Sequence, residues 1–531
     1  MLLRSRQFLP IINDVWRLAL PVIFTNLLQT LVNVIDIFMV GRLGPLEVAA
    51  IGMGQVIRML VLVGVLSVTA GTMSLAAQAK GRRDAEGLSF VSRQTLILAL
   101  FFGIALSLFG LLFAEPILTF LGSGSSDEVI RHGVSYLHIY FLGGIFLTLN
   151  FSINALMQGA GDTVTPLILV GIINSFNVLL NYIFMFGPGP FPELGLDGAA
   201  LGTVVSRGIG ALLGIILFYS GRNVIKLKGF DYRPNFAMFK DILGIGVPSG
   251  LQGIVRNMTQ VFVVRIVTST SAGAFGAAAL AIGSQIESLA TMPVLGINVA
   301  ATALIGSSLG AWQTKEAQLR GNIAILFSVF LMLILSLPLM LFAPQLVLLF
   351  EPTAEATILS AGSSYLRING LSYMFVAIAM VSNGALRGAG DTLRSMFFTM
   401  IGRWFVSVPV AYILALKMGY GINGVWIGLA LGNLVQAILL LNRWLQKPWI
   451  NVALKKSMLY RKHLANLPEN LQEQFLEEIR APIMRQKNMA EFVDEEGVSY
   501  QSDLETLRYT FQNGGFEGPN PLHFQTSTSQ A

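Results

Sequence analysis

The stretch LVNVIDIFMVGRLG, residues 31–44, ends the first long apolar segment of the chain. The 24 residues between Arg17 and Arg42 include one charged side chain, Asp36. A helix needs about 20 apolar residues to cross the hydrocarbon core of a bilayer. The segment therefore predicts a transmembrane helix that carries a carboxylate within the membrane.

Composition extends this prediction to most of the chain. Of its 531 residues, 54% are hydrophobic and 12% are charged, whereas soluble domains carry about 25% charged residues. The mean hydropathy is +0.66, and the 54 glycines suit close packing between membrane helices. The composition is that of an all-α polytopic membrane protein.

Several classes of site are excluded by residue type. The absence of cysteine removes disulfides, thiolate metal sites, haem attachment and cysteine nucleophiles. The four histidines are scattered without metal-binding spacing. The net charge of +6 does not indicate a nucleic-acid partner, because the basic residues concentrate in certain loops. We expect no cofactor other than a coupling ion, H⁺ or Na⁺, and a monomer in the lipid bilayer.

Twelve apolar segments are long enough to be transmembrane helices. They cover residues 14–40, 47–76, 91–115, 132–158, 163–187, 196–219, 239–268, 275–309, 320–347, 360–386, 394–417 and 421–444. Residues 1–13 lack the apolar core and cleavage site of a signal peptide. We interpret them as an interfacial lead-in to the first helix.

Alternate loops carry the basic residues, which sets the orientation of the helices. The basic loops hold Lys80, Arg82, Arg83, Arg93, Arg222, Lys226, Lys228, Arg233, Lys240, Lys315 and Arg320. The loops between them are poor in cations, and GPGPFPELGLD has none. We therefore expect both termini in the cytoplasm, and a bacterial plasma membrane as the location.

The two halves of the chain resemble each other in five places. ALMQGAGDT (155–163) returns as ALRGAGDT (385–392), AIGMGQVIRML (50–60) as AIGSQIESLA (281–290), YLHIYFL (136–142) as YLRINGL (365–371), LDGAALG (196–202) as INGVWIG (422–428), and Pro21 as Pro248. The order is the same in both halves, which indicates an internal duplication.

Each half holds six predicted helices, an even number, so both copies enter the membrane from the same side. Parallel repeats of this kind surround a central cavity in transporters that work by alternating access. We assign residues 14–219 to an N-lobe, 220–238 to a cytoplasmic inter-lobe loop and 239–445 to a C-lobe.

Residues 446–531 form a polar cytoplasmic tail. Apolar residues at helical spacing predict helices over 471–486 and 502–512, whereas residues 513–531 are expected to be disordered. The tail is either a simple appendage or a regulatory or partner-binding segment.

Asp36 is the leading candidate for a functional group. A carboxylate at membrane depth normally faces the protein interior and marks an ion or substrate pathway. Asp36 lies five residues before Gly41, in the outer half of the first helix. It can bind and release a proton, or hold Na⁺ with help from neutral oxygens. Asn33, one turn earlier, lies on a similar face, and we include it in the ion site. A structural aspartate bonded to neighbouring helices is the alternative.

The segment 163–187 carries a strip of carboxamides. Asn174, Asn177 and Asn181 fall at helical positions i, i+3 and i+7, so they share one face. The next segment adds Thr203. Amides and hydroxyls are suitable ligands for a hard cation. We place Asn177, Asn181 and Thr203 with Asp36 in an ion-coupling site, with hydrogen bonding between helices as the alternative.

The second half has no counterpart of Asp36, because that position falls near Val263 or Val264. Its one membrane-depth carboxylate between Arg265 and Lys315 is Glu287. Glu287 is a second titratable site, a recognition group for cationic cargo, or the partner of an arginine (Arg58, Arg256 or Arg265). We assign Asn154, Arg58, Arg256 and Glu287 to substrate binding.

The two GAGDT turns lack the lysine and the strand context of a phosphate loop. Their glycines permit a tight turn, and Asp162 and Asp391 are placed to cap the helices that follow. We expect both aspartates to be structural.

These residues carry a resemblance to a known family. PVIFTNLLQTLVNVIDIFMVGRLG, the paired GAGDT turns and the carboxamide strip resemble the multidrug and toxin extrusion (MATE) family of the MOP flippase superfamily. The resemblance covers about residues 10–445, and it is closest to the prokaryotic DinF-type branch. The tail has no counterpart in the minimal family pattern.

The resemblance implies a secondary antiporter. Such proteins expel organic, often cationic or amphiphilic, compounds in exchange for H⁺ or Na⁺. It implies that Asp36 is the coupling residue and that Asn177, Asn181 and Thr203 line the same cation site. Some relatives carry a second carboxylate at the position of Asn181, so the choice of ion stays open, with H⁺ favoured. Arg256 and Val376 stand near places where another branch uses acidic ligands, so no second Na⁺ site is expected.

Three other functions remain as alternatives. A flippase for lipid-linked precursors would need a basic cavity, and only Arg58 and Arg256 are candidates for one. A membrane enzyme would need paired acids, whereas the acids here are isolated. A channel would show no countertransport.

Overall fold

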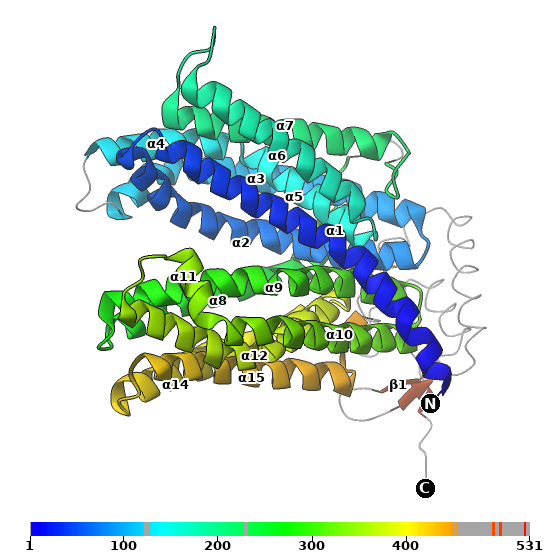
Figure 1. Cartoon of the computed structure of the whole chain (residues 1–531). Coiled ribbons are helices and arrows are strands. Elements are labelled where there is room, and N and C mark those ends of the chain that lie inside the picture. The colour runs from blue at the N-terminus through cyan, green and yellow to red at the C-terminus, as the bar shows by residue number, and fades with distance from the viewer. Residues whose placement is uncertain are drawn as a thin grey trace.

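The computed structural model describes residues 2–121, 127–227, 232–450, 452–453, 491–493, 499–501 and 525–526. Side chains are described for residues 8–54, 63–120, 127–227, 232–450 and 452–453. The helices form two stacked groups, which are separated in sequence as well as in space (Figure 1). The predicted helical fold and its two lobes are therefore confirmed.

The N-lobe group begins at the N-terminus. It consists of α1 (Leu2–Gly41), α2 (Pro45–Gly81), α3 (Ala85–Leu121), α4 (Asp127–Leu142) with α5 (Gly144–Gly159), α6 (Val164–Phe186) and α7 (Gly195–Tyr219). The predicted lead-in, residues 1–13, is not a separate element, because α1 runs without a break from Leu2.

The C-lobe group repeats this order. It consists of α8 (Phe236–Thr268), α9 (Gly273–Gly310), α10 (Thr314–Leu341) with α11 (Ala343–Phe350), α12 (Ala356–Gly388), a composite helix, and α15 (Gly421–Gln446). The composite helix is built from α13 (Thr392–Met400), the π-helical turns η1 (Ile401–Ser407) and η2 (Ile413–Lys417), and α14 (Val408–Tyr412) between them.

Nine helices in the described part of the chain are long and apolar enough to cross a membrane. The pair α4 and α5 makes a tenth span, bent by 51°, where the sequence predicted one transmembrane segment over 132–158. The other two predicted segments, 47–76 and 239–268, correspond to the long helices α2 and α8, which pack against each other between the lobes.

The lobes are in contact at the end that carries the N-terminus and the basic turns. Here α2 lies against α8 and α9. A Cβ atom on Gly246 would clash with the Ser67 carbonyl oxygen, and one on Gly310 would clash with that of Gln78. The Gln78 side chain also donates to the Gly388 carbonyl oxygen, at 3.1 Å. Glycine thus permits backbone-to-backbone contact between the lobes at this basic end.

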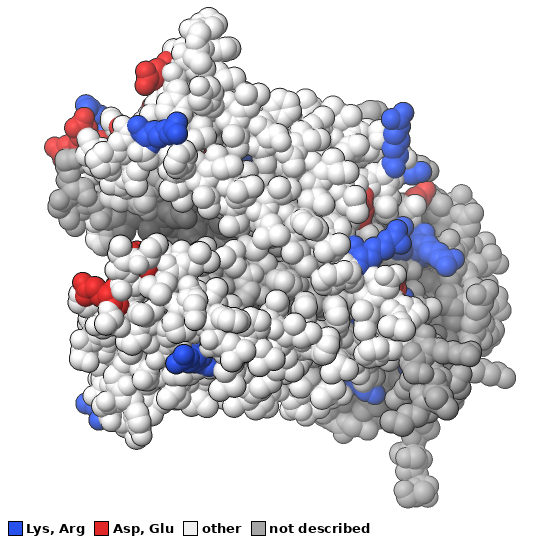
Figure 2. Space-filling view, viewed as in Figure 1, with Lys and Arg blue, Asp and Glu red and all other residues white. Residues whose placement is uncertain are grey.

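At the opposite end the lobes diverge. Figure 2 shows the surface hollowed between them there; lysines and arginines lie at both ends, and their largest group is at the closed end. The structure is therefore open at one end of the inter-lobe space and closed at the other.

Helix α1 belongs to both lobes. Val15, Ala19 and Ile23 in its first half are part of the C-lobe core, together with residues of α9 and α12. Met39 and Val40 near its end are part of an N-lobe core. The helix crosses from one group to the other in Figure 1.

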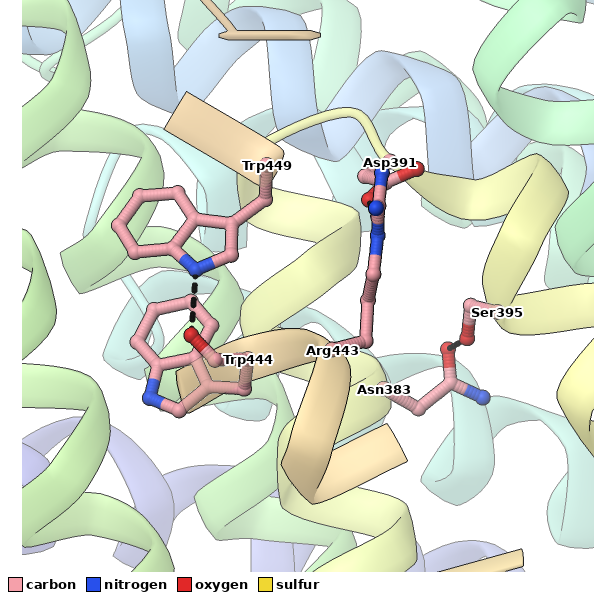
Figure 3. A network of polar contacts seen from close by, with 6 residues as sticks. All are labelled: Asn383, Asp391, Ser395, Arg443, Trp444 and Trp449. Atoms are coloured by element: carbon pink, nitrogen blue, oxygen red, sulfur yellow. Dashed lines mark hydrogen bonds and ion pairs between the residues drawn. The ribbon is translucent and has the colours of Figure 1, made fainter. Parts of the chain in front are cut away.

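The two GAGDT turns differ in what their aspartates do. The Asp162 carboxylate accepts from the Thr165 amide at 3.0 Å, which caps α6 as predicted. Asp391 makes no such cap. Its carboxylate instead forms a buried ion pair with Arg443 of α15, with a nitrogen–oxygen distance of 2.8 Å (Figure 3). The capping prediction is thus correct for the first copy and wrong for the second.

The chain turns back after α15. Lys447 adopts a left-handed conformation, and the buried Trp449 stacks on Trp444 with ring centroids 4.3 Å apart. Farther along lies a three-stranded antiparallel sheet of β1 (Glu491–Val493), β2 (Ser499–Gln501) and β3 (Gln525–Thr526). Strand β3 falls in the segment 513–531 that is predicted to be disordered, and the other residues of that segment lie outside the described residues. The predicted helices over 471–486 and 502–512 lie outside the described residues.

Candidate functional site

The C-terminal half of α1 places Asp36 against the carboxamide face of α6. Asn174, Asn177 and Asn181 are all buried, as their shared helix face predicts. The Asn181 side-chain amide donates to the Asp36 carboxylate at 2.9 Å. Asp36 itself is half-buried. The predicted carboxylate and the predicted carboxamide strip are therefore in direct contact.

A chain of polar contacts continues from Asp36 into the lobe. The Asn181 amide also lies 3.4 Å from the Asn177 side-chain oxygen. Asn177 in turn donates to the Thr203 hydroxyl of α7 at 3.1 Å. Ser206, one turn after Thr203, lies 3.5 Å from the same amide. Ser206 was missed by sequence analysis, although its spacing from Thr203 on one helix face was a usable signal.

The site is rich in oxygen atoms. The Asn181 side-chain oxygen is buried without a hydrogen-bond partner, beside an amide that is bonded to Asp36. Carboxylate, carboxamide and hydroxyl oxygens are ligands for hard cations, and an unpaired buried acceptor is costly unless something occupies it. No group of three or more His, Cys, Asp or Glu side chains that could hold a metal ion is found in the described part of the chain. Oxygen atoms of this kind can hold a hard cation, and a carboxylate can also hold a proton.

The absence of a side chain at Gly202 of α7 leaves space for the Asn181 side chain. A Cβ atom at this position would clash with the Asn181 side-chain oxygen and would approach the Asn181 backbone nitrogen. The close approach of α6 and α7 at the site therefore depends on glycine.

Two sequence-predicted site residues of the N-lobe, Asn33 and Asn154, have no hydrogen bond to this network among the described residues. Asn33 is exposed, one turn before Asp36. Asn154 of α5 is half-buried. The Arg58 side chain lies outside the described residues.

The C-lobe holds a second polar group built around Glu287 of α9. The Tyr365 hydroxyl of α12 donates to its carboxylate, and Arg403 of η1 interacts with it electrostatically. Arg256 of α8 interacts with Arg403 in turn. Within the described side chains, Glu287 has no ion pair with Arg256 or Arg265, so these two of the predicted pairings are wrong.

Arg403 was not singled out by sequence analysis. It lies in a π-helical turn of the composite helix, where the 3.6-residue spacing used to assign helix faces does not hold. Arg265 lies elsewhere, in a groove of about 370 Å³ shared with Phe262 and Tyr412.

A sequence profile of the MatE family matches residues 21–183 and again residues 248–413. The same family pattern thus occurs twice in the chain, once in each lobe. This finding confirms the duplication that the repeated segments predict.

Two curated relatives cover nearly the same length. The chain is 29% identical over 460 residues to a probable multidrug resistance protein NorM of Thermotoga maritima, covering 86% of this chain and 96% of the relative. It is 30% identical over 443 residues to a NorM of Mesorhizobium japonicum, covering 81% and 92%. These names do not assign the DinF-type branch, which stays a prediction.

Solved structures share the fold. One, described as an outward-facing conformation of a multidrug resistance MATE family transporter, aligns with a TM-score of 0.74 at 26% identity, over 84% of this chain and 96% of its own. A MOP superfamily transporter from Pyrococcus furiosus, described as having a binding pocket of reversed polarity, aligns with a TM-score of 0.75 at 26% identity, over 83% and 96%. The chain therefore belongs to the MatE family and is a multi-pass membrane transporter of the multidrug-efflux (MATE) type, not an enzyme.

Proposed function

We propose that this transporter is an antiporter that exports organic cations and other amphiphilic compounds in exchange for H⁺ or Na⁺. The observation that carries the proposal is the contact between Asp36 of α1 and Asn181 of α6. It joins the helix shared by the two lobes to the polar interior of the N-lobe. Ion occupancy of Asp36 then bears directly on how α1 packs.

The coupling step follows from charge. An ion-free Asp36 carries a negative charge, which attracts a cationic cargo and accepts a hydrogen bond from the Asn181 side-chain amide. Binding of H⁺ or Na⁺ neutralises the carboxylate, so the attraction for cargo falls and the contact with Asn181 changes. An ion drives the transition only if it binds the two conformations with different affinity.

We favour H⁺ as the coupling ion. Among the described residues that these hydrogen bonds join, Asp36 is the carboxylate and the others are neutral amides and hydroxyls. A proton needs only that carboxylate. Sodium would need several oxygens to close around it, for which Asn177, Asn181 and Thr203 are the candidates.

We place the basic, closed end in the cytoplasm, in accord with the positive-inside rule. The hollow between the lobes then faces outward, and both termini of the membrane part lie inside the cell. We expect a monomer in a bacterial plasma membrane, with no cofactor beyond the coupling ion.

The test is efflux of a fluorescent organic cation from proteoliposomes, with a pH gradient and a Na⁺ gradient imposed in turn. Replacing Asp36→Asn removes the ion site and keeps the side-chain size, so ion-driven efflux should fall at least a hundredfold while the protein still inserts and folds. Asp162→Asn, which alters a helix cap outside the network, is the matched control and should retain efflux. Full ion-driven efflux by Asp36→Asn would contradict the proposal.

A flippase for lipid-linked precursors is the second candidate, and the arginine pair Arg256 and Arg403 is the observation that favours it. The same proteoliposomes distinguish the two functions. A flippase would move a fluorescent lipid-linked substrate between leaflets and would leave the soluble cation inside.

A further inference from the structure

The carbonyl group that ends α12 in the C-lobe is bonded to the N-lobe. In the turn that follows α12, three backbone amides donate to the carbonyl oxygens of Ala385, Leu386 and Arg387, which are carbonyls that a helix end leaves without intrahelical partners. The next carbonyl oxygen, that of Gly388, accepts two hydrogen bonds from side chains of α2. The Gln78 amide donates to it at 3.1 Å, and the Ser74 hydroxyl donates at 3.3 Å.

Both of these bonds lie inside the contact between the lobes. Gln78 is 3% exposed and Ser74 is fully buried, so water does not compete for the Gly388 carbonyl oxygen while the basic end is closed. If the lobes separate at this end, the donors and the acceptor must bond to water instead. Such an exchange still favours the bonds within the protein, typically by a small amount per bond.

The acceptor is fixed to the rest of the C-lobe by polar contacts between α9 and α12. The Thr302 hydroxyl of α9 donates to the Gly384 carbonyl oxygen at 2.9 Å. The Arg387 guanidinium donates to that hydroxyl at 3.3 Å and to the Asn298 side-chain oxygen of α9. The end of α12 is therefore held to α9, and the two bonds from α2 connect one lobe to the other rather than to a loose helix end.

The backbones of the two halves meet symmetrically at this end. A Cβ atom on Gly310 of α9 would clash with the Gln78 carbonyl oxygen, and one on Gly81 of α2 would clash with the Ser307 carbonyl oxygen. Each carbonyl lies three residues before the glycine of its own helix, so the two contacts exchange when the halves are exchanged. Ser307 is therefore the C-lobe counterpart of Gln78.

The side chains break this symmetry. The Ser307 hydroxyl donates to the Leu304 carbonyl oxygen of its own helix at 3.0 Å, and within the described part of the chain no hydrogen bond joins its side chain to the N-lobe. By the same spacing, the counterpart of Ser74 is Ala303, which has no hydroxyl group. The polar link between the lobes thus comes from the N-lobe copy alone, whereas the close backbone contact comes from both copies.

We propose that Gln78, assisted by Ser74, is a positioning residue of the transport cycle that favours the conformation in which the basic end is closed. The inference rests on the proposed function only in that alternating access requires this end to open. The two side chains act through the Gly388 carbonyl group and bind neither ion nor cargo. They shift the equilibrium between the closed and the open conformation, because their bonds exist in only one of the two.

The test measures opening of the basic end through the reactivity of one buried thiol. Ala303 of α9 is buried against Met73 and Ala155 of the N-lobe, so Ala303→Cys places a thiol in the contact between the lobes. The chain has no cysteine of its own, and this thiol is therefore the only one that can react. The rate of its alkylation by a water-soluble maleimide is measured on the purified full chain, without an ion gradient or cargo.

Three substitutions are compared in the Ala303→Cys background. Gln78→Met keeps the length of the side chain and removes the amide donor, so it should raise the alkylation rate about fivefold, the factor that corresponds to one neutral hydrogen bond. Ser74→Ala should raise it about twofold, because the Ser74 bond is the longer of the two. Ser307→Ala is the matched control, since its hydroxyl bonds to its own helix, and it should leave the rate unchanged.

A second reporter separates opening from local unfolding. Ala76 lies on α2, two residues before Gln78, and it is buried in the core of its own lobe. A Cβ atom on Gly159 of α5 would lie 3.1 Å from the Ala76 Cβ atom, so Ala76→Cys places a thiol inside the N-lobe. Gln78→Met should not change the alkylation rate of this thiol.

Two results would overturn the inference. The first is an Ala303→Cys alkylation rate that neither Gln78→Met nor Ser74→Ala raises. The second is an equal rise at Ala303→Cys and Ala76→Cys, which would mean that the substitution loosens the N-lobe instead of opening the basic end. Neither measurement uses efflux, so full ion-driven efflux by Asp36→Asn would contradict the proposed function and leave the role of Gln78 in closure intact.

Discussion

At the scale of single residues, the polar network around Asp36 depends on the absence of a side chain at Gly202. Gly202 has no side chain, and the Asn181 side-chain oxygen occupies the space where a Cβ atom would lie. The amide of the same carboxamide bonds to Asp36. A methyl group at residue 202 would therefore displace the Asn181 side chain without touching the Asp36 carboxylate.

We expect Gly202→Ala to reduce ion-driven efflux at least tenfold, because the displaced Asn181 amide no longer reaches Asp36. Gly208→Ala on the same helix is the matched control, since its Cβ would make ordinary contact with Phe146, at 3.6 Å or more. Initial rates in proteoliposomes, normalised to the amount of inserted protein, measure the effect. Equal rates in the two variants would show that the position of Asn181 does not matter.

The sequence could predict which residues form this site because they obey helical spacing. Asn177 and Asn181 share a face, and Asp36 is the one acid of its segment, so their meeting required only that α1 and α6 be neighbours. Arg403 could not be found in this way. Its partnership with Arg256 arises from tertiary packing around a π-helical turn, and no spacing within the sequence encodes it.

At the scale of helices, the duplicated GAGDT turns have diverged. In the first copy the aspartate is a helix cap, which satisfies one backbone amide. In the second copy the aspartate reaches Arg443 of the last membrane helix, and both side chains are buried. The second turn therefore holds α13 and α15 together, a role that the shared motif does not reveal.

Breaking this ion pair from one side should be costly, because a buried Asp391 carboxylate would be left without its partner. We expect Arg443→Met to reduce the free energy of unfolding by about 3–5 kcal/mol, and Asp391→Asn added to it to recover most of the loss. Thermal unfolding in detergent measures both changes.

A less buried pair on α10 serves as the control for this experiment. Arg320 and Glu316 form an ion pair at 2.6 Å with side chains that are 22% and 38% exposed, and a solvent-accessible ion pair contributes about 0–1 kcal/mol. Arg320→Met should therefore leave the unfolding temperature almost unchanged. A loss as large as that of Arg443→Met would mean that burial does not explain the effect.

Some features of the helices could not be predicted from sequence. The 51° bend between α4 and α5 falls at Gly143 and Gly144, inside a continuous apolar run. The apolar run predicts that the segment is long enough to span the membrane, but it does not predict the change in direction of the helix axis. The positions of the π-helical turns in the composite helix likewise depend on packing against the neighbouring helices.

At the scale of the whole molecule, the two lobes meet through glycines at the basic end. A Cβ atom on Gly306 of α9 would lie 2.7 Å from the Ala77 Cβ atom of α2. Disulfides join Cβ atoms about 3.8 Å apart. A small separation of α2 and α9 would therefore allow a disulfide between residues 77 and 306. Because the chain has no cysteine, no native thiol can form a disulfide in place of an engineered pair.

We expect the double variant Ala77→Cys and Gly306→Cys to form a cross-link that holds the basic end closed. Efflux should stop under oxidising conditions and return on reduction, since alternating access requires this end to open. Each single cysteine variant is a control and should be insensitive to the oxidant. Transport at the full rate by the cross-linked protein would exclude separation of the lobes at this contact.

The longest-range consequence follows from α1, whose two halves lie in different lobes. Rigid rocking of one lobe against the other cannot leave a helix straight when its ends are fixed to both. Pro21 lacks an amide hydrogen and cannot complete the helical ladder. It stands within the segment packed on the C-lobe, between Ala19 and Ile23, and 15 residues before Asp36. Bending of α1 at that proline would therefore move the Asp36 carboxylate whenever the angle between the lobes changes. The conformation of the two lobes and the ion bound at Asp36 would then be linked through a single helix.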